Sequence, residues 1–272
     1  MTSISCALIN LKGGVGKTSV TLGLAAAGAE AGARVLVVDL DPQANASLCL
    51  APDLDPDEDL TVNDVLAADK PGAIVDAIRK TAWANVDVVP SQLELDGREH
   101  DPAANATHRL RRAMRGLTGY DLVLIDCRPS VGRLTTNALV AAGTALVVTD
   151  PDRAAIRGVG EALRHVEVVA EDLNPSLMLA GIVVNRTDGR KSEHGYRVRE
   201  ITDSYGAAVW QPPIPDRTVI AQAYGAGVPV ASMSNTGPAL EVARIYRAHL
   251  QALLRTGSPD SDITEKGHNV SS

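Results

Sequence analysis

One short segment constrains the fold of this 272-residue chain more than any other, because it joins a predicted strand to a predicted helix. Residues 4–11 are an apolar, β-type run, and residues 18–31 are rich in Ala and Leu and are followed by Gly32. Between them, residues 12–18 read Lys-Gly-Gly-Val-Gly-Lys-Thr. Such a turn lets the backbone wrap around phosphate oxygens, with N–H groups and the helix N-terminus supplying positive charge. The segment predicts a phosphate-binding loop.

Lys17 and Thr18 carry the chemistry expected of that loop. We expect the Lys17 ammonium to bridge the β- and γ-phosphates of ATP and the Thr18 hydroxyl to bind Mg²⁺, so the predicted cofactors are ATP and Mg²⁺. The standard pattern GxxxxGK[ST] is not met, because its first glycine would fall on Leu11, and a second lysine, Lys12, stands beside that position. The predicted nucleotide-binding residues of the loop are Gly13, Gly14, Val15, Gly16, Lys17, Thr18 and Ser19.

Strand-like and helix-like segments alternate along the rest of the chain. The predicted strands cover residues 34–39, 86–90, 120–126, 145–149, 179–184 and 208–210. The predicted helices cover residues 105–115, 134–142, 154–171, 196–205, 219–224 and 238–254. This alternation predicts an α/β fold of the P-loop NTPase type, with a doubly wound, mostly parallel sheet and helices on both faces. Ligands bind such sheets at the carboxyl ends of the strands.

Two stretches depart from the alternation. Residues 52–59 are acidic and rich in proline, which is typical of a surface insertion. Residues 255–272 are rich in Ser, Asp and Gly and almost lack large apolar side chains, so we predict a disordered C-terminal tail there. The chain is therefore interpreted as one ATPase domain over residues 1–254 followed by a tail.

Two carboxylates stand where predicted strands end. Asp126 closes the strand at 120–126, where a Mg²⁺-ordering Asp is needed, and we expect it to act through a metal-bound water because Mg²⁺ gives up its waters reluctantly. Asp41 follows the strand at 34–39 and is better suited to position the attacking water, since phosphoryl transfer needs positioning more than a strong base. Either residue alone would also fit a strand-end turn, but the phosphate loop and both carboxylates occur together in chain order.

These segments resemble the ParA/MinD group of deviant Walker A ATPases. The matching pieces are KGGVGKTS at 12–19, VVDLDPQAN at 37–45 and LVLIDCRPS at 122–130, and the second is most similar to ParA/Soj partition proteins. Weaker matches extend the resemblance over residues 4–254. It implies a cytoplasmic, nucleoid-associated ATPase that forms a homodimer on Mg·ATP and binds double-stranded DNA non-specifically. It also implies release from DNA upon hydrolysis, which a ParB-like DNA-binding protein stimulates.

The resemblance also implies roles for single residues. Lys12 would reach the phosphates of the partner subunit, much as an arginine finger does, and would be catalytic together with Lys17 and Asp41. Asn185, at the end of its strand, would contact adenine. Arg128 departs from the family pattern, which has proline at this position, and three roles stay open for it: a phosphate contact, a place in the dimer interface, or a solvated turn.

The formal net charge of −7 excludes DNA binding by the average field of the chain, so a local basic patch must supply it. Residues 186–199 are locally basic, although such a run also fits a solvated helix face. The predicted DNA-binding residues are Arg186, Arg190, Lys191, Arg197, Arg199 and Arg217, with Arg244 and Arg247 as secondary candidates. We expect binding without sequence preference, because the first predicted strand begins at Ile4 and leaves no room for an operator-reading domain before it.

A nucleotide-gated scaffold that positions a cargo other than DNA, MinD-like or orphan ParA-like, is the alternative function. A membrane-cycling protein of that group would need a basic amphipathic helix at its C-terminus, and residues 256–272 offer neither an apolar nor a basic face, so no membrane partner is expected. The three cysteines, Cys6, Cys49 and Cys127, show no metal-site spacing and are interpreted as reduced thiols.

Overall fold

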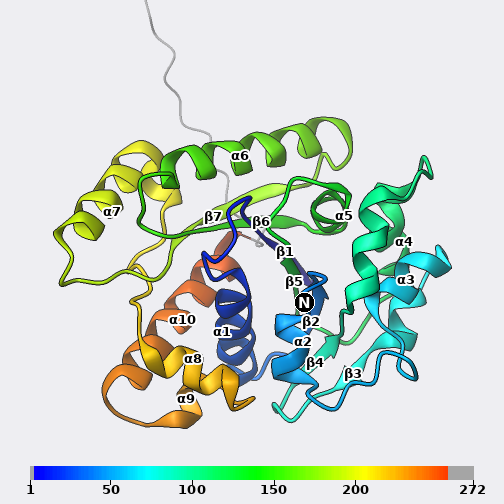
Figure 1. Ribbon diagram of the computed structural model, residues 1–272, viewed down its shortest axis with the longest axis horizontal. Helices are drawn as coiled ribbons and strands as arrows, with labels where there is room; N and C mark the ends of the chain where they lie inside the picture. The colour runs from blue at the N-terminus through cyan, green and yellow to red at the C-terminus, as the bar shows by residue number, and fades with distance from the viewer. Residues whose placement is uncertain (1–2, 257–272) are drawn as a thin grey trace, which may run out of the picture.

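In the computed structural model, residues 3–256 are described, and they form a seven-stranded sheet in the order β3-β4-β2-β5-β1-β6-β7 (Figure 1). The strands are β1 (Ile4–Ile9), β2 (Val35–Leu40), β3 (Arg79–Lys80), β4 (Val86–Val89), β5 (Leu122–Cys127), β6 (Thr144–Thr149) and β7 (Met178–Val184). All neighbouring strands pair in parallel except β3, which runs antiparallel to β4 at one edge. The predicted mostly parallel α/β sheet is confirmed.

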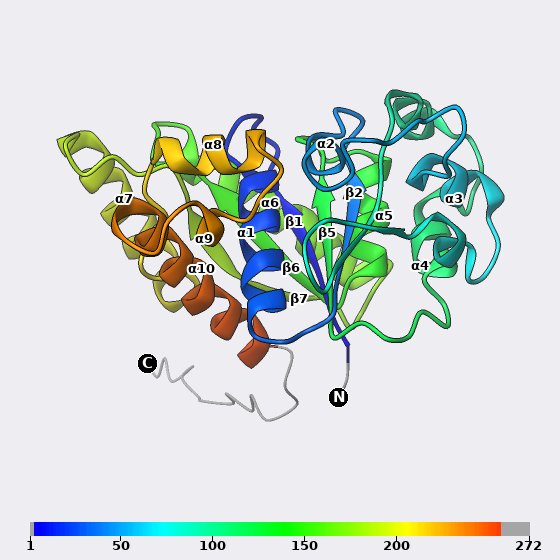
Figure 2. The same cartoon turned by 90° about the horizontal axis from the view of Figure 1, so that it is seen from below.

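Helices cover both faces of this sheet. The α-helices are α1 (Lys17–Glu30), α2 (Asn45–Leu50), α3 (Val62–Ala68), α4 (Arg109–Ala113), α5 (Arg133–Ala141), α6 (Ala155–Asp172), α7 (Ser192–Tyr205), α8 (Thr218–Gly225), α9 (Val230–Met233) and α10 (Gly237–Thr256). The 3₁₀ turns are η1 (Ala73–Ala77), η2 (Leu93–His100), η3 (Ala106–His108) and η4 (Gly206–Ala208). Helices α3 to α7 pack on one face, and α1, α2 and α8 to α10 pack on the other (Figures 1 and 2).

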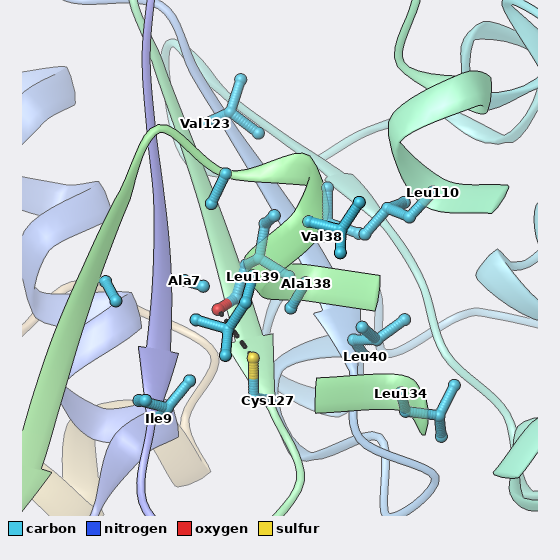
Figure 3. Packing of buried hydrophobic residues seen from close by; sticks show 14 of the residues in the cluster. Ala7, Ile9, Val38, Leu40, Leu110, Val123, Cys127, Leu134, Ala138 and Leu139 are labelled. Carbon is cyan, nitrogen blue, oxygen red and sulfur yellow. Dashed lines mark hydrogen bonds between the residues drawn. The ribbon is translucent and has the colours of Figure 1, made fainter. Parts of the chain in front are cut away.

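Alternate residues of each central strand contribute their side chains to two separate hydrophobic cores, one on each face of the sheet. Ala7 and Ile9 of β1 point to the face covered by α5, whereas Cys6 and Leu8 point to the face covered by α1. Figure 3 shows the first core, where strand residues such as Val38 pack against Ala138 and Leu139 of α5. Because both faces are buried, the central strands read as continuous apolar runs, which is why the sequence revealed them.

Several predicted elements differ from the structure. The strand predicted at 208–210 is not formed: only Val209 bridges to Ile182, and the prolines Pro212 and Pro213 that follow lack the N–H donors of a continuing strand. The helix predicted at 105–115 is instead η3 followed by the short α4. Helices α2, of 6 residues, and α3, of 7, were not predicted, because each is too short to show a helical period.

The predicted insertion at 52–59 is a largely exposed turn region. The predicted tail at 255–272 lies outside the described residues except for Arg255 and Thr256, which are the last two residues of α10 rather than the start of a tail. Among residues 3–256, no helix combines the length and the apolar character needed to span a bilayer.

His249 on α10 makes folding stability depend on pH. The ring is 0 % exposed, its Nε2 donates to the Pro212 carbonyl at 2.9 Å, and its Nδ1 has no partner among the described residues. Burial lowers the pKa of His249 to about 4, against a smaller opposing effect of the Pro212 hydrogen bond. Protonation would place an unpaired charge in the core.

We expect this histidine to destabilise the fold as the pH falls from about 6.5 to about 4, because the unfolded chain then binds a proton that the folded chain excludes. The free energy of unfolding should fall by up to about 3 kcal/mol from this group. Urea unfolding of wild type and of His249→Gln at about pH 6.5 and about pH 4 measures this loss of unfolding free energy. His100→Gln, which changes an exposed histidine, is the control. Equal pH dependence in His249→Gln and wild type would contradict the assignment.

Candidate nucleotide-binding site

The loop between β1 and α1 has a backbone that requires glycine. Gly14 and Gly16 have φ angles of +79° and +89°, and a Cβ on Gly16 would lie 2.2 Å from Nδ2 of Asn185. That Nδ2 donates to the Val15 carbonyl at 2.8 Å, so Asn185, directly after β7, fastens the loop. The structure thus gives Asn185 a loop-positioning contact that the sequence did not predict.

A cavity of about 660 Å³ opens beside this loop, at the end of the sheet where Figure 2 shows α2 and α8. Its lining residues are Gly14, Gly16, Lys17, Thr18, Ser19, Leu22, Asp41, Gln43, Asn45, Leu48, Cys49, Pro129, Arg186, Ala221, Tyr224 and Gly225. A smaller cavity of about 190 Å³ shares Gly16, Ser19, Arg186 and Ala221 with it and adds Asn185. Gly13 and Val15, also predicted, do not line either cavity. Both cavities are lined by polar and apolar side chains beside one phosphate loop.

Lys17 begins α1 and points into a site without a carboxylate partner. Its side chain is nearly buried, its ammonium donates only to the Asn10 carbonyl at 3.4 Å, and it forms no ion pair with the described residues. Burial lowers the pKa of Lys17, and the more distant charge of Asp126 opposes this effect. A buried, weakly partnered ammonium is suited to receive a phosphate.

Asp126 and Asp39 lie side by side at the carboxyl ends of β5 and β2, where the two residues are in register. Burial raises the pKa of Asp126 to about 7 and the Asp39 charge adds to this, while the Thr18 hydroxyl and Lys17 lower it. One Asp126 oxygen accepts from the Thr21 hydroxyl at 3.1 Å, and the other, Oδ2, is buried without a partner. An orphaned carboxylate oxygen beside Thr18 fits the predicted water-mediated Mg²⁺ site.

Asp39 is a structural member of the site that sequence reasoning missed. It is fully buried, and one of its oxygens accepts from both the backbone N–H and the hydroxyl of Ser47 at 2.8 and 2.7 Å. Its other oxygen accepts from the Asp41 N–H at 3.2 Å. Burial raises the pKa of Asp39 to about 6, although these hydrogen bonds lower it. Asp39 therefore holds α2 and the Asp41 turn against the cavity.

Asp41 itself lines the cavity, as predicted. It is only partly buried, and its Oδ1 accepts from the Gln43 N–H at 3.0 Å, a contact within its own turn. The second carboxylate oxygen has no hydrogen-bond partner among residues 3–256 and is available to a water in the cavity. This geometry fits water positioning rather than metal ligation.

Comparisons with known proteins decide the family. An AAA domain family model matches residues 3–179. The chain is 34% identical to the sporulation initiation inhibitor protein Soj of Bacillus subtilis, over 82% of this chain and 88% of that protein. It is 35% identical to the chromosome partitioning protein ParA of Caulobacter vibrioides, over 82% of this chain and 85% of that protein. The chain belongs to the ParA/Soj partition ATPase family.

The similarity extends to a solved three-dimensional structure. A protein of Mycobacterium smegmatis described as cobyrinic acid a,c-diamide synthase, with bound ADP and magnesium, is 33% identical. It matches with a TM-score of 0.77, over 93% of this chain and 95% of that one. The predicted resemblance to ParA/Soj proteins and the predicted P-loop fold are both confirmed by these matches.

In this ParA-type chain, Lys12 lies outside its own nucleotide cavity. Its ammonium contacts both carboxylate oxygens of Asp150 at 2.8 Å and also pairs with Asp152. Burial would lower the pKa of Lys12, but the two carboxylates outweigh it and raise that pKa. The signature lysine is therefore held at the end of β6 by two acidic residues that the sequence analysis did not associate with it.

Arg128 pairs with carboxylates of its own chain, a contact that the sequence did not predict. Its guanidinium pairs with Asp96 at 2.7 Å and approaches Glu99 at 3.9 Å, both on η2. Glu99 in turn accepts from the Leu134 N–H at 3.0 Å, at the start of α5. Arg128 thus ties the loop after Asp126 to η2, and it does not line the nucleotide cavity.

Four of the six predicted DNA-binding residues contact other groups of their own chain. Arg186 donates to the Gly14 carbonyl at 2.7 Å and lines the nucleotide cavity, and it shares the smaller cavity with Arg217. Arg190, Arg197 and Arg217 each pair with a nearby carboxylate. Arg199 and Lys191, on α7 or just before it, have no side-chain hydrogen bond or ion pair with residues 3–256.

Of the two secondary candidates, Arg247 forms an ion pair with Glu30 at 2.9 Å. Arg244 lines a surface groove together with Arg217. The set of residues that contacts DNA therefore stays a prediction. The pairs depend on tertiary contacts or on side-chain directions that a charge pattern does not show. Exposed pairs of this kind are weak and can open toward a phosphate.

Proposed function

We propose that this ParA-type ATPase dimerises on Mg·ATP, binds double-stranded DNA non-specifically in that state, and releases DNA upon hydrolysis stimulated by a ParB-like protein. Its cofactors are ATP and Mg²⁺. The observation that carries the proposal is the placement of the two lysines. Lys17 is buried and unpaired in the cavity, whereas Lys12 is held outside it by carboxylates. We also propose a cytoplasmic, nucleoid-associated location.

We assign a separate role in ATP binding and hydrolysis to each residue of the site. The loop N–H groups and the Lys17 ammonium would bind the phosphates, and Asp126 Oδ2 and the Thr18 hydroxyl would hold Mg²⁺, the carboxylate through a metal-bound water. Mg²⁺, when bound, neutralises charge on the phosphate oxygens. Asp41 orients the attacking water from the cavity wall. Asn185 and Ala221 line the smaller cavity, which we assign to adenine.

Lys12 must leave Asp150 and Asp152 before it can reach the phosphates of a partner subunit. The two carboxylates therefore compete with dimerisation in the free chain. We expect Asp150→Asn, which keeps the shape and removes a charge, to strengthen the ATP-dependent dimer about threefold to tenfold, since each dimer frees two lysines. Light scattering with a non-hydrolysable ATP analogue measures this effect.

Asp203→Asn, on the exposed side of α7, is the matched control. Lys12→Ala should lose the dimer while it keeps nucleotide binding by the monomer. Unchanged dimerisation in both Asp150→Asn and Lys12→Ala would show that Lys12 does not act across the interface.

A second candidate arises from the M. smegmatis neighbour, whose described activity forms amides. Amidation with glutamine as nitrogen source requires a reactive thiolate. Cys6, Cys49 and Cys127 are all buried, and burial raises the pKa of each thiol. These thiols do not support that chemistry, so partition remains the better proposal, with the nucleotide-gated scaffold as its alternative.

ATP hydrolysis tests the proposal when it is measured alone, with duplex DNA, and with a candidate ParB-like protein. We expect slow turnover alone and faster turnover when DNA and the partner are both present. Turnover that responds to neither DNA nor any ParB-like partner, but does respond to another cargo protein, would favour the nucleotide-gated scaffold. Formation of an amide product would favour the synthase.

A further inference from the structure

A basic face lies outside the nucleotide site, on α4 and the turns on either side of it, with His108 before the helix and Arg115 after it. Four of its side chains recur at the i, i+3, i+4, i+7 spacing that places residues on one side of a helix. They are His108, Arg111, Arg112 and Arg115. All four line a cavity of about 280 Å³ together with Asp69 and Asn105. Figures 1 and 2 place α3 and α4 at the opposite end of the molecule from α7 and α10.

The backbone that carries these side chains is firmly anchored. Leu110 and Ala113, on the opposite side of α4, are fully buried in the core. The buried Asn137 of α5 accepts from the Leu110 N–H at 3.1 Å and donates to the Ala106 carbonyl at 2.7 Å. The arginines therefore extend from a fixed element rather than from a mobile loop.

The positive charge of the cavity is poorly neutralised. Asp69 is the one carboxylate among its lining residues, and its oxygens are engaged by Asn105 at 2.8 Å and by Arg112 at 3.4 Å. Arg111 and Arg115 form no side-chain hydrogen bond or ion pair within residues 3–256. On α7, by comparison, Arg197 is paired with Glu193 and Glu200, while Arg199 has no ion pair within residues 3–256.

Like charges at i, i+3 and i, i+4 disfavour a helix, so the sequence retains a local repulsion here that a bound anion would relieve. Guanidinium groups match phosphate by bidentate hydrogen bonds, and several of them around one small cavity match closely spaced phosphates. We propose that this cavity binds vicinal phosphate groups, supplied either by a free polyphosphate-type anion or by a stretch of DNA backbone.

Inorganic tripolyphosphate tests the site directly. Calorimetry in Mg²⁺-free buffer on the Lys17→Ala chain, whose phosphate loop is disabled, should show binding that Arg111→Ala with Arg115→Ala weakens at least about tenfold. The matched control is Arg157→Ala with Arg164→Ala, which removes the same charge from the exposed side of α6. No binding, or equal binding in the α4 double variant, would overturn the proposal.

A second experiment identifies the source of the phosphates, and it depends on the DNA binding that we propose for this chain. A labelled duplex is titrated at low salt with the otherwise wild-type chain and an ATP analogue, with and without the α4 changes. Loss of DNA affinity identifies the DNA backbone, and unchanged DNA affinity with lost tripolyphosphate binding identifies a free anion. If the wild-type chain binds no DNA, the proposed function fails while the tripolyphosphate result still decides this site.

Discussion

Lys17→Ala is expected to abolish ATP binding. The ammonium is nearly buried beside the cavity and donates only to the Asn10 carbonyl, so it is available to phosphate, whereas the guanidinium of Arg186 already donates to the Gly14 carbonyl. Loss of two charge-assisted hydrogen bonds to phosphate costs about 4 kcal/mol, or roughly a thousandfold in affinity. Calorimetric titration with Mg·ATP measures the loss. Normal ATP affinity in this variant would refute the phosphate-loop assignment.

The same variant should be no less stable than wild type without nucleotide. Burial lowers the pKa of Lys17, and one hydrogen bond of 3.4 Å compensates the ammonium poorly, so the free chain loses little when the side chain is removed. Urea unfolding separates loss of binding from loss of folding. Lys70→Ala, at an exposed lysine paired with Asp76, is the control for removing one positive charge.

Asp41→Ala is expected to keep ATP binding and the ATP-dependent dimer while it stops turnover. The carboxylate lines the cavity, yet its hydrogen bonds lie within its own turn, where Oδ1 accepts from the Gln43 N–H. Loss of a group that positions and polarises the attacking water should reduce the hydrolysis rate at least about a hundredfold. Steady-state phosphate release and analogue-dependent light scattering measure the two properties separately.

Asp57→Ala is the matched control, because it removes an exposed carboxylate from the 52–59 segment. Asp41→Asn adds a second comparison, since it keeps the size of the side chain and its contact with Gln43. Hydrolysis at the wild-type rate in Asp41→Ala would remove Asp41 from the mechanism. Loss of ATP binding in Asp41→Ala would instead show that Asp41 contributes to the ATP-bound complex before hydrolysis.

The nucleotide loop and the sheet could be predicted because their signals are local. Residues 12–18 are contiguous, and the buried parallel strands read as unbroken apolar runs. The contacts that complete the site join distant parts of the chain. Asn185 lies 170 residues from Val15, and Lys12 lies 138 residues from Asp150, so only the packed sheet brings them together.

A charge pattern does not show which basic side chains have partners in the folded chain. The run at 186–199 counts as basic, but Asp188 and Glu200 pair with its arginines, and Arg186 turns to the phosphate loop. The arginines of the helix predicted at 105–115 share a cavity only because α4 packs beside Asp69. Side-chain partners decide which charges remain available, and a linear sequence does not specify them.

DNA affinity of Asp41→Ala in the presence of ATP, compared with ADP, tests the central claim most directly, because this variant should hold the ATP-bound dimer without turnover. Fluorescence anisotropy of a labelled duplex, at low and at physiological salt, is the measurement. The account predicts binding with ATP alone, no dependence on base sequence, and a steep loss as salt rises. Equal affinity with ADP, or no affinity for any duplex with ATP at low salt, would contradict it.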